Sequence, residues 1–354
     1  MKVSVVIPVY NAQGTIASCL RSLNAQEELP HEVIVIDNNS TDNSPKIVKE
    51  NVAAFPNLKL VIDSQPKRGP AAARNKGMLI ATGDIIAFTD SDCTANRDWI
   101  KNIKRIFAED AGLDAVGGIE VSSPAGASLT GKFLSAFWLA APKKLSRSII
   151  AAKEDYLRDI YVATFNCAFK RELLLDIGGF DEAFFPTGED IDLWMRALER
   201  NAKIVAWDSS LIVSHQQNLS ARGLMRKTFK YGEAYARLSK KHFRHKIIFQ
   251  IPGLGQYKLN ARFATIVVTQ HFMKLFLLIL ITSLSLRVSF MLTLAVILCA
   301  VFYFFFNIRI SVIRKGYVIS LWDNALLLFL FVLRELAEEI GRICGSLRHK
   351  VLCL

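Results

Sequence analysis

The sequence of 354 residues contains little that would stabilise a small secreted or zinc-binding protein. It has six cysteines, and no two of them form a C-x-x-C pair or show zinc-ligand spacing, so we expect free thiols in a reducing compartment. The first residues, MKVSVVIPVY, lack the features of a cleavable signal peptide, because their apolar run is short and ends at a proline. These absences argue against a disulfide-stabilised secreted domain.

Acidic residues are scarce in one part of the chain. The whole sequence has 44 Lys or Arg against 32 Asp or Glu, a net charge of +12. Residues 222–262 contain eleven of the basic residues and one acid, Glu233. This basic segment is interleaved with Leu, Phe and Tyr and precedes long apolar runs, a pattern that favours an anionic membrane surface and not nucleic acid as a partner. The positive-inside rule then predicts that the segment is cytoplasmic.

Long apolar runs are confined to the C-terminal part of the chain. Residues 268–286 and 288–307 are each long enough for a transmembrane helix, and residues 318–345 predict an interfacial or third membrane helix. We therefore expect a globular domain over residues 1–220, a basic amphipathic juxtamembrane segment over 221–264 and a membrane region over 265–354. The expected location is the inner or cytoplasmic membrane, multi-pass, with the globular domain in the cytoplasm.

Strand-like and helix-like patterns alternate through the globular part. Such alternation predicts an α/β fold with parallel βαβ units, in which ligands bind beyond the carboxyl ends of the strands. Strands are expected at residues 3–9, 32–36, 58–62, 85–88, 115–121, 164–169, 203–206 and 211–215. Helices are expected at residues 15–25, 42–54, 71–81, 99–107, 171–177 and 189–200, and the last of these is amphipathic, with Trp194 on its core side.

Carboxylates follow two of the expected strands. Asp37 comes directly after the second strand, and Asp90 and Asp92 follow the strand at 85–88, with the small Ser91 between them. Both carboxylates of this Asp-Ser-Asp turn could face one hard cation, Mg²⁺ or Mn²⁺, that also holds phosphate oxygens. An isolated Asp-x-Asp is more often a solvated turn, so the rest of the chain has to decide between the two interpretations.

Several motifs occur in a recognisable order. They are VSVVIPVYN at the N-terminus, DNNSTDNS after the second strand, AARNKG followed by ATGD, then DSDC, and finally GGFDEAFFPTGEDIDLWMRA. Over residues 2–220 the chain resembles family 2 glycosyltransferases with the GT-A fold. The resemblance implies a mixed, mainly parallel sheet with flanking helices, a nucleotide-diphosphate sugar as donor and a divalent cation, Mn²⁺ or Mg²⁺, as cofactor.

The donor needs different contacts for its base, its ribose and its diphosphate. Tyr10 could supply a flat face for the base or serve only as a core aromatic, and Asp37 could accept hydrogen bonds from base or ribose or only cap a turn. Arg68 and Arg74 are candidates to pair with phosphate, or are surface cations. With what the resemblance implies, the nucleotide-sugar-binding candidates are Pro8, Tyr10, Asp37, Arg68, Arg74, Asp84 and Asp90.

The cation and the acceptor need further residues. The metal candidates are Asp92, Asp90 and His215, although a lone histidine is more often structural. Glu189 and Asp190 open a helix, where the helix dipole stabilises anions, and helix capping is their alternative role. By resemblance Asp190 is the general base, supported by Glu189, and Asn166 and Cys167 line the acceptor side. One base and one direct displacement predict inversion at the anomeric carbon.

These observations predict a membrane-anchored, metal-dependent inverting glycosyltransferase of the cell-envelope polysaccharide type. The expected acceptor is a hydroxyl or phosphate on a lipid-linked molecule, such as a glycolipid or a polyprenyl-linked glycan. A nucleotidyltransferase is one alternative, but it would need a Gly-rich phosphate loop where this chain has PVYNAQG. A non-catalytic membrane scaffold is the other, and the presence of Asp37, Asp92 and Asp190 argues against it.

Overall fold

The chain folds into two compact units in a computed structural model that describes residues 1–121, 130, 133, 148–150, 163–215, 220–244, 246–251, 255–260, 266–268 and 321–353. The first unit comprises residues 1–123 and 141–217, and the second comprises residues 124–140 and 218–354. The division near residue 218 lies close to the domain boundary expected at residue 220.

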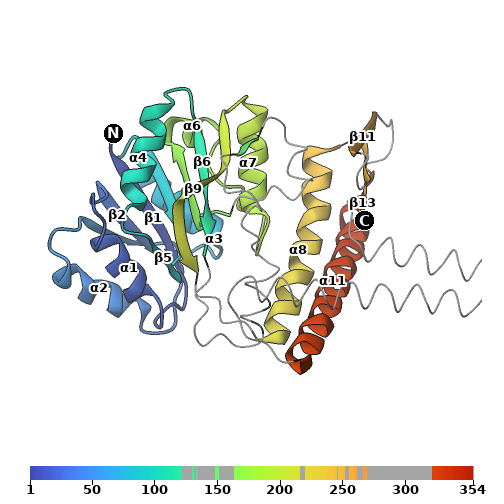
Figure 1. The fold of residues 1–354 in the computed structure, drawn as a ribbon, viewed down its shortest axis with the longest axis horizontal. Helices are drawn as coiled ribbons and strands as arrows, with labels where there is room; N and C mark the ends of the chain where they lie inside the picture. The colour runs from blue at the N-terminus through green and yellow to red at the C-terminus, as the bar shows by residue number, and fades with distance from the viewer. Residues whose placement is uncertain are drawn as a thin grey trace, which may run out of the picture. The chain divides into compact units, whose positions relative to one another are not determined.

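A mixed sheet forms the first unit (Figure 1). Its strands run in the order β3-β2-β1-β4-β8-β6-β9-β5, and β7 (Ser148–Ile150) pairs with β9 (Ile204–His215). The first four strands in this order are mutually parallel: β3 (Leu60–Ser64), β2 (Glu32–Asp37), β1 (Val3–Val9) and β4 (Ile85–Thr89). Next, β8 (Asn166–Lys170) runs antiparallel to both β4 and β6 (Ala115–Glu120). The expected mixed α/β sheet is confirmed, but parallel pairing dominates only its first half.

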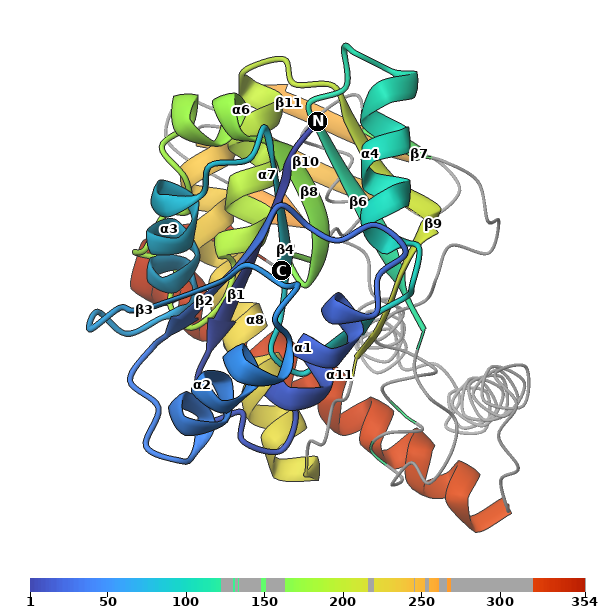
Figure 2. The same cartoon turned by 90° about the vertical axis from the view of Figure 1, so that its left-hand side faces the viewer.

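Helices flank this sheet, and apolar side chains fill the space between. The helices are α1 (Ile16–Asn24), α2 (Ser44–Ala54), α3 (Pro70–Ile80), α4 (Trp99–Glu109), α6 (Arg171–Asp176) and α7 (Glu189–Glu199). Helix α3 packs on β1 and β2, and α4 packs on β9 (Figure 2). The fully buried Trp194 of α7 stacks on Phe169 of β8, with ring centroids 4.3 Å apart, which confirms the predicted core role of Trp194.

Two strands differ from the sequence-based expectation. Residues 204–215 form one 12-residue strand, β9, where two short strands were expected, because the polar residues Asp208 to Ser210 are accommodated by irregular register around Gly118 of β6. The three-residue strand β5 (Cys93–Ala95) was not expected at all. It pairs antiparallel with the end of β9 and so returns the chain that follows Asp92 toward His215.

The second unit contains two helices that pack side by side, α8 (Ala221–His242) and α11 (Leu321–His349) (Figure 1). A Cβ atom added to Gly232 would collide with the carbonyl oxygen of Glu338, and one added to Gly341 with that of Phe229, so the helices meet backbone to backbone. A four-stranded sheet of order β11-β10-β12-β13 completes the described part of this unit. Its strands are β10 (Lys246–Ile251), β11 (Gly255–Asn260), β12 (Ile266–Val268) and β13 (Leu352–Cys353).

Of the three membrane segments expected from the sequence, the structure describes most of one. None of the helices in the described ranges combines the length and the apolar character that a membrane crossing needs. From residue 321 on, the segment expected at residues 318–345 belongs to α11, in which Glu335, Glu338 and Arg342 are buried. The two spans expected at residues 268–286 and 288–307 lie outside the described residues, except for Val268 at the end of β12.

One buried carboxylate ties together the amino ends of the parallel strands. Glu32 accepts hydrogen bonds from the Ser4 hydroxyl at 2.8 Å, from the Thr82 amide and hydroxyl at 2.7 Å each, and from the Lys59 ammonium at 2.8 Å. Burial alone would raise the pKa of Glu32, but these hydrogen bonds outweigh it and lower the pKa to about 2. The carboxylate therefore stabilises the fold in its ionised form.

We expect the Glu32→Gln variant to be less stable than the wild type at pH 7 by about 2 kcal/mol, because a charge-assisted network loses its acceptor. The folded-state pKa is depressed, so this stabilisation is complete above the unfolded-state pKa of about 4.5 and is lost as pH falls toward 2. Urea unfolding at pH 7, 5, 4 and 3 measures the difference, with the exposed Glu50→Gln as control. A stability difference that stays constant over this range would contradict the assignment.

Candidate functional site

The carboxyl edge of the sheet gathers polar side chains from distant parts of the sequence. Tyr10 follows β1, Asp37 ends β2, and Asp90 follows β4. Because β8 is antiparallel to both β4 and β6, the strands β6 and β9 run in the direction of β4 and end at this same edge with Glu120 and His215. The sheet thus brings together carboxylates and an imidazole that lie up to 178 positions apart in the sequence.

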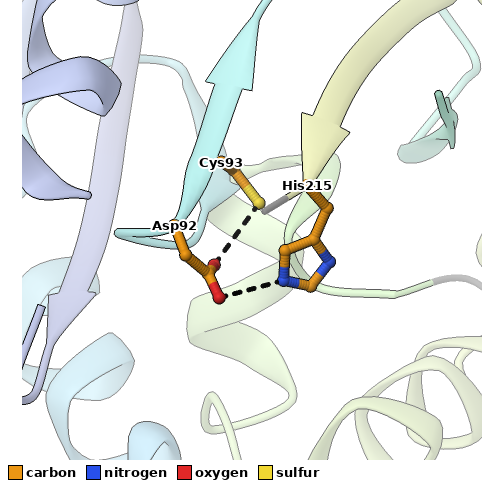
Figure 3. A group of neighbouring side chains, drawn as sticks. All are labelled: Asp92, Cys93 and His215. Carbon is orange, nitrogen blue, oxygen red and sulfur yellow. Dashed lines mark hydrogen bonds and ion pairs between the residues drawn. The ribbon is translucent and has the colours of Figure 1, made fainter. Parts of the chain in front are cut away.

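Asp92, Cys93 and His215 form a group at this edge (Figure 3). Strand pairing places Cys93 opposite His215, whose Nε2 lies 3.1 Å from Oδ2 of Asp92. The Cys93 Sγ lies 3.7 Å from Oδ1 of Asp92, and one ligand atom from each of the three residues lies within 4.8 Å of the others. A carboxylate and an imidazole at this separation suit a divalent cation such as Mn²⁺.

His215 is held between two carboxylates. Its side chain is 7% exposed, and its Nδ1 lies 3.7 Å from Oε2 of Glu120 on the side away from Asp92. Burial alone would lower the pKa of His215, but the neighbouring carboxylates of Asp92 and Glu120 raise it to about 9. Glu120 was absent from the sequence-based candidates, although it is the acid at the end of an expected strand, and that position could have identified it.

Three buried thiols surround the Asp-Ser-Asp turn. Burial, with the charges of Asp90 and Asp92, raises the pKa of Cys93 well above its ordinary value. Burial likewise raises the pKa of Cys19, whose Sγ donates to the carbonyl oxygen of Asp90 at 3.5 Å, and the pKa of Cys167. All three are therefore neutral thiols, and the Cys93 thiol donates a hydrogen bond to the Asp92 carboxylate.

Arg74 of α3 lies inside the protein between two carboxylates. Its Nη2 is 2.8 Å from Oδ1 of Asp90, its Nη1 is 3.0 Å from Oε1 of Glu189, and the residue is only 3% exposed. Burial works against the positive charge, but the charges of Asp90 and Glu189 raise the pKa of Arg74 further. The sequence predicted a direct phosphate contact for Arg74, whereas the structure pairs its guanidinium with protein carboxylates.

Glu189 and Asp190 begin helix α7, directly after Gly188, whose positive φ of 100° starts the helix sharply. Both are buried, with exposures of 6% and 8%. Burial and the adjacent Asp190 raise the pKa of Glu189 despite the opposing charge of Arg74. Among the described residues, Oε2 of Glu189 is buried without a hydrogen-bond partner, while Oδ1 of Asp190 accepts the Ile191 amide at 2.9 Å.

The expected donor-binding residues lie at or beside the same edge. Tyr10 is 53% exposed, Pro8 is partly buried in β1, and Arg68 is exposed in the loop before α3. Oδ1 of Asp37 is buried and has no hydrogen-bond partner in the described part of the chain, so it is an acceptor that a ligand could satisfy. Asn38 fixes the loop around Arg68 by accepting the Gly69 amide at 2.8 Å and donating to two loop carbonyls.

Three further candidates make contacts within the fold. Asp84 precedes β4 and accepts the Lys2 amide at 2.8 Å, so it lies at the opposite end of that strand from Asp90, and its predicted donor contact is corrected to a structural role. Asn166 begins β8 opposite Thr89 at the carboxyl edge; it is 1% exposed, accepts from the Trp99 indole and donates both amide hydrogens to backbone carbonyls. Cys167 is the next residue of β8 and is buried. The acceptor-side roles of Asn166 and Cys167 stay predictions.

Comparisons with known proteins agree with this geometry. Residues 4–178 match the model of Glycosyl transferase family 2. The chain is 30% identical over 201 residues to "Glycosyltransferase AglE" of Haloferax volcanii, which covers 56% of this chain and 61% of that protein. It is 26% identical over 227 residues to the glucosyl-dolichyl phosphate glucuronosyltransferase of the same organism, covering 61% and 69%. It is 29% identical over 246 residues to the pre-mycofactocin glycosyltransferase of Mycobacterium tuberculosis, covering 68% and 48%.

A solved structure with a similar fold is the mannosyltransferase PcManGT from Pyrobaculum calidifontis, determined in complex with GDP-Man and Mn²⁺. The alignment covers 99% of this chain and 87% of that one, with a TM-score of 0.55 and 20% identity, so the likeness concerns the fold. The chain spans about three fifths of AglE and about half of the mycobacterial relative. Residues 4–178 thus match Glycosyl transferase family 2, and the mixed sheet is similar in fold to the GT-A-like PcManGT.

Proposed function

We propose that this protein is an inverting glycosyltransferase that moves a sugar from a nucleotide-diphosphate donor to a hydroxyl or phosphate of a lipid-linked acceptor. The observation that carries the proposal is the contact of one guanidinium, Arg74, with both Asp90 and Glu189. This contact brings the Asp-Ser-Asp turn and the first residues of α7 within one side chain of each other. The first set would lie at the sugar donor and the second at the attacking acceptor. Transfer requires donor and acceptor to be held side by side, and so the two sets of carboxylates must be adjacent.

The donor half of the site would use the ends of β1 and β2. The buried acceptor Oδ1 of Asp37 suits a donor group of the base or ribose, and the exposed ring of Tyr10 could cover the base. The exposed Arg68 is better placed than the buried Arg74 to pair with the diphosphate. The complex of PcManGT with GDP-Man supports a nucleotide-diphosphate sugar as the class of donor.

A divalent cation, Mn²⁺ or Mg²⁺, would be held by Asp92 and His215, with Asp90 beside it. When bound, such a cation neutralises the negative charge that develops on the diphosphate leaving group. Cys93 would keep the Asp92 carboxylate oriented, and Glu120 would do the same for the His215 ring.

Asp190 would accept the proton of the acceptor hydroxyl as that oxygen attacks the anomeric carbon. Its position in the first turn of α7 stabilises the carboxylate form through the helix dipole. The neighbouring Glu189 is held by Arg74 and would shape the site without taking the proton. A single base and a single displacement lead to inversion at the anomeric carbon.

We expect Asp190→Asn to lower turnover at least about 100-fold while leaving nucleotide binding within about twofold, because only proton removal is lost. Transfer is measured with labelled nucleotide sugars, Mn²⁺ and a lipid extract, and binding by calorimetry with UDP and GDP. The control is Asp176→Asn at an exposed position. An equal loss of nucleotide affinity would assign Asp190 to the donor half, and a product of retained configuration would contradict single displacement.

Removal of a proposed cation ligand should weaken cation binding directly. We expect Asp92→Asn and His215→Ala each to lower Mn²⁺ affinity by about 10- to 100-fold, measured by electron paramagnetic resonance of free Mn²⁺. Asp63→Asn, at a half-exposed carboxylate on β3, should leave the affinity unchanged. Wild-type affinity in both ligand variants would place the cation elsewhere.

The second unit supports association with a membrane that carries the acceptor. Along α11 exposed apolar side chains recur every three or four residues, with one interval of seven: Trp322, Leu326, Phe329, Leu336, Ile340, Ile343 and Leu347. Helix α8, which packs on α11, exposes the basic residues Arg222, Arg226, Lys240 and Lys241. An apolar stripe beside basic residues is typical of helices that lie on anionic lipid. The dolichyl phosphate in the name of one relative supports a polyprenyl-type acceptor at a cytoplasmic membrane surface.

We expect the full chain to sediment with vesicles of phosphatidylcholine containing about one third phosphatidylglycerol, and less with phosphatidylcholine alone. Combining Leu336→Glu with Ile340→Glu should lower the bound fraction severalfold, because charge is placed on the apolar stripe. Lys46→Glu, at an exposed position of α2, is the control. Unchanged binding of the double variant would show that the stripe does not contact lipid.

A further inference from the structure

The role of Arg74 follows from what its guanidinium contacts. The side chain is almost wholly buried, and its two terminal nitrogens are 2.8 Å from Asp90 and 3.0 Å from Glu189, residues separated by 99 positions in the chain. Its planar face lies over the ring of Phe180, with 5.6 Å between the guanidinium carbon and the ring centroid. Both terminal nitrogens are therefore committed to protein carboxylates and not turned toward a ligand phosphate.

The next residue of α3 binds the same part of the chain. Asn75 accepts the Phe180 amide at 2.7 Å and donates to the Phe180 carbonyl and to Glu182, each at 2.9 Å. The Phe180 ring in turn meets Phe88 of β4 edge to face, with centroids 5.2 Å apart. Helix α3 therefore fixes the segment that leads into α7 against the strand that leads into Asp90.

The cluster is poorly arranged for stability alone. Two charges, those of Arg74 and Glu189, are taken out of water, and within the described residues both Nε of Arg74 and Oε2 of Glu189 are buried without hydrogen-bond partners. Replacing such a buried ion cluster by apolar residues often costs a protein no stability. The guanidinium instead fixes the separation between the carboxylates of Asp90 and Glu189, because its nitrogen atoms are held rigidly in one plane. A lysine ammonium has no such planar group and could not fix this separation.

We propose that Arg74 is a positioning residue that sets the distance between the donor-side carboxylate Asp90 and the start of α7, where Glu189 and Asp190 lie. This inference rests on the proposed transferase function. Without Arg74, the carboxylates of Asp90 and Glu189 would repel each other without a cation between them, and the first turn of α7 would move away from the Asp-Ser-Asp turn. The donor would still bind, but the base would no longer hold the acceptor oxygen in line with the reacting carbon.

The test compares Arg74→Lys, Arg74→Gln and the double variant Arg74→Gln with Glu189→Gln, each checked for folding by circular dichroism. We expect kcat to fall about 100-fold in Arg74→Lys, while the Kd for UDP or GDP with Mn²⁺ stays within about threefold. Hydrogen exchange should increase at the amides of residues 180–193. The double variant removes one charge of each sign, so it keeps the fold measurable should Arg74→Gln alone fail to fold.

Arg171→Lys is the matched control, since this arginine donates to the Ala81 carbonyl at the opposite end of β4. It should change neither kcat nor exchange at residues 180–193. A large rise in nucleotide Kd with kcat unchanged in Arg74→Lys would overturn the proposal in favour of direct phosphate binding, and unchanged exchange would overturn it outright. If the wild type transfers no sugar while exchange still rises in Arg74→Lys, the transferase function fails and the positioning contact stands.

Discussion

The pairing of β8 antiparallel to both β4 and β6 is the constraint on which the site depends. A reversed strand between two others makes its neighbours run the same way, so β4 and β6, and with β6 also β9, all end at one edge. If β8 were antiparallel to only one of these two strands, Asp90 and His215 would lie at opposite edges of the sheet. The short strand β5 then completes the arrangement by turning Asp92 and Cys93 back onto the end of β9.

The two edges of the sheet differ in how they balance charge. At the amino edge the carboxylates are satisfied within the protein, since Glu32 accepts four hydrogen bonds and Asp84 accepts a backbone amide. At the carboxyl edge the acids Asp37, Asp90, Asp92, Glu120, Glu189 and Asp190 outnumber the nearby cations Arg68, Arg74 and His215 in the described part of the chain. A surplus of negative charge at a strand edge is what a divalent cation would balance, and it marks this edge as the functional one.

Much of the first unit could be predicted from the sequence, because its periodic patterns are strong. The strand at Val3–Val9, the helix beginning at Glu189 and the buried Trp194 all follow from apolar spacing. Strand β9 was predicted as two pieces because its centre is polar, and β5 is too short to show any period.

Site residues were harder to predict, because a motif gives the position of a residue along the chain and not the direction of its side chain. Asp84 and Asp90 flank the same strand, and only the strand direction separates their environments. Asn166 occurs where the resemblance implies an acceptor contact, yet its amide joins Trp99 to two strands. The ion pairs of Arg74 depend on tertiary packing, which no spacing rule reveals.

The three buried thiols near the Asp-Ser-Asp turn have a practical consequence. Cys19, Cys93 and Cys167 are protonated and at most 1% exposed, so an alkylating reagent can reach them only when the surrounding sheet transiently opens. The rate of their modification therefore measures how often this region opens in the folded protein. Slower labelling after addition of a nucleotide or a cation would register binding without any knowledge of the acceptor.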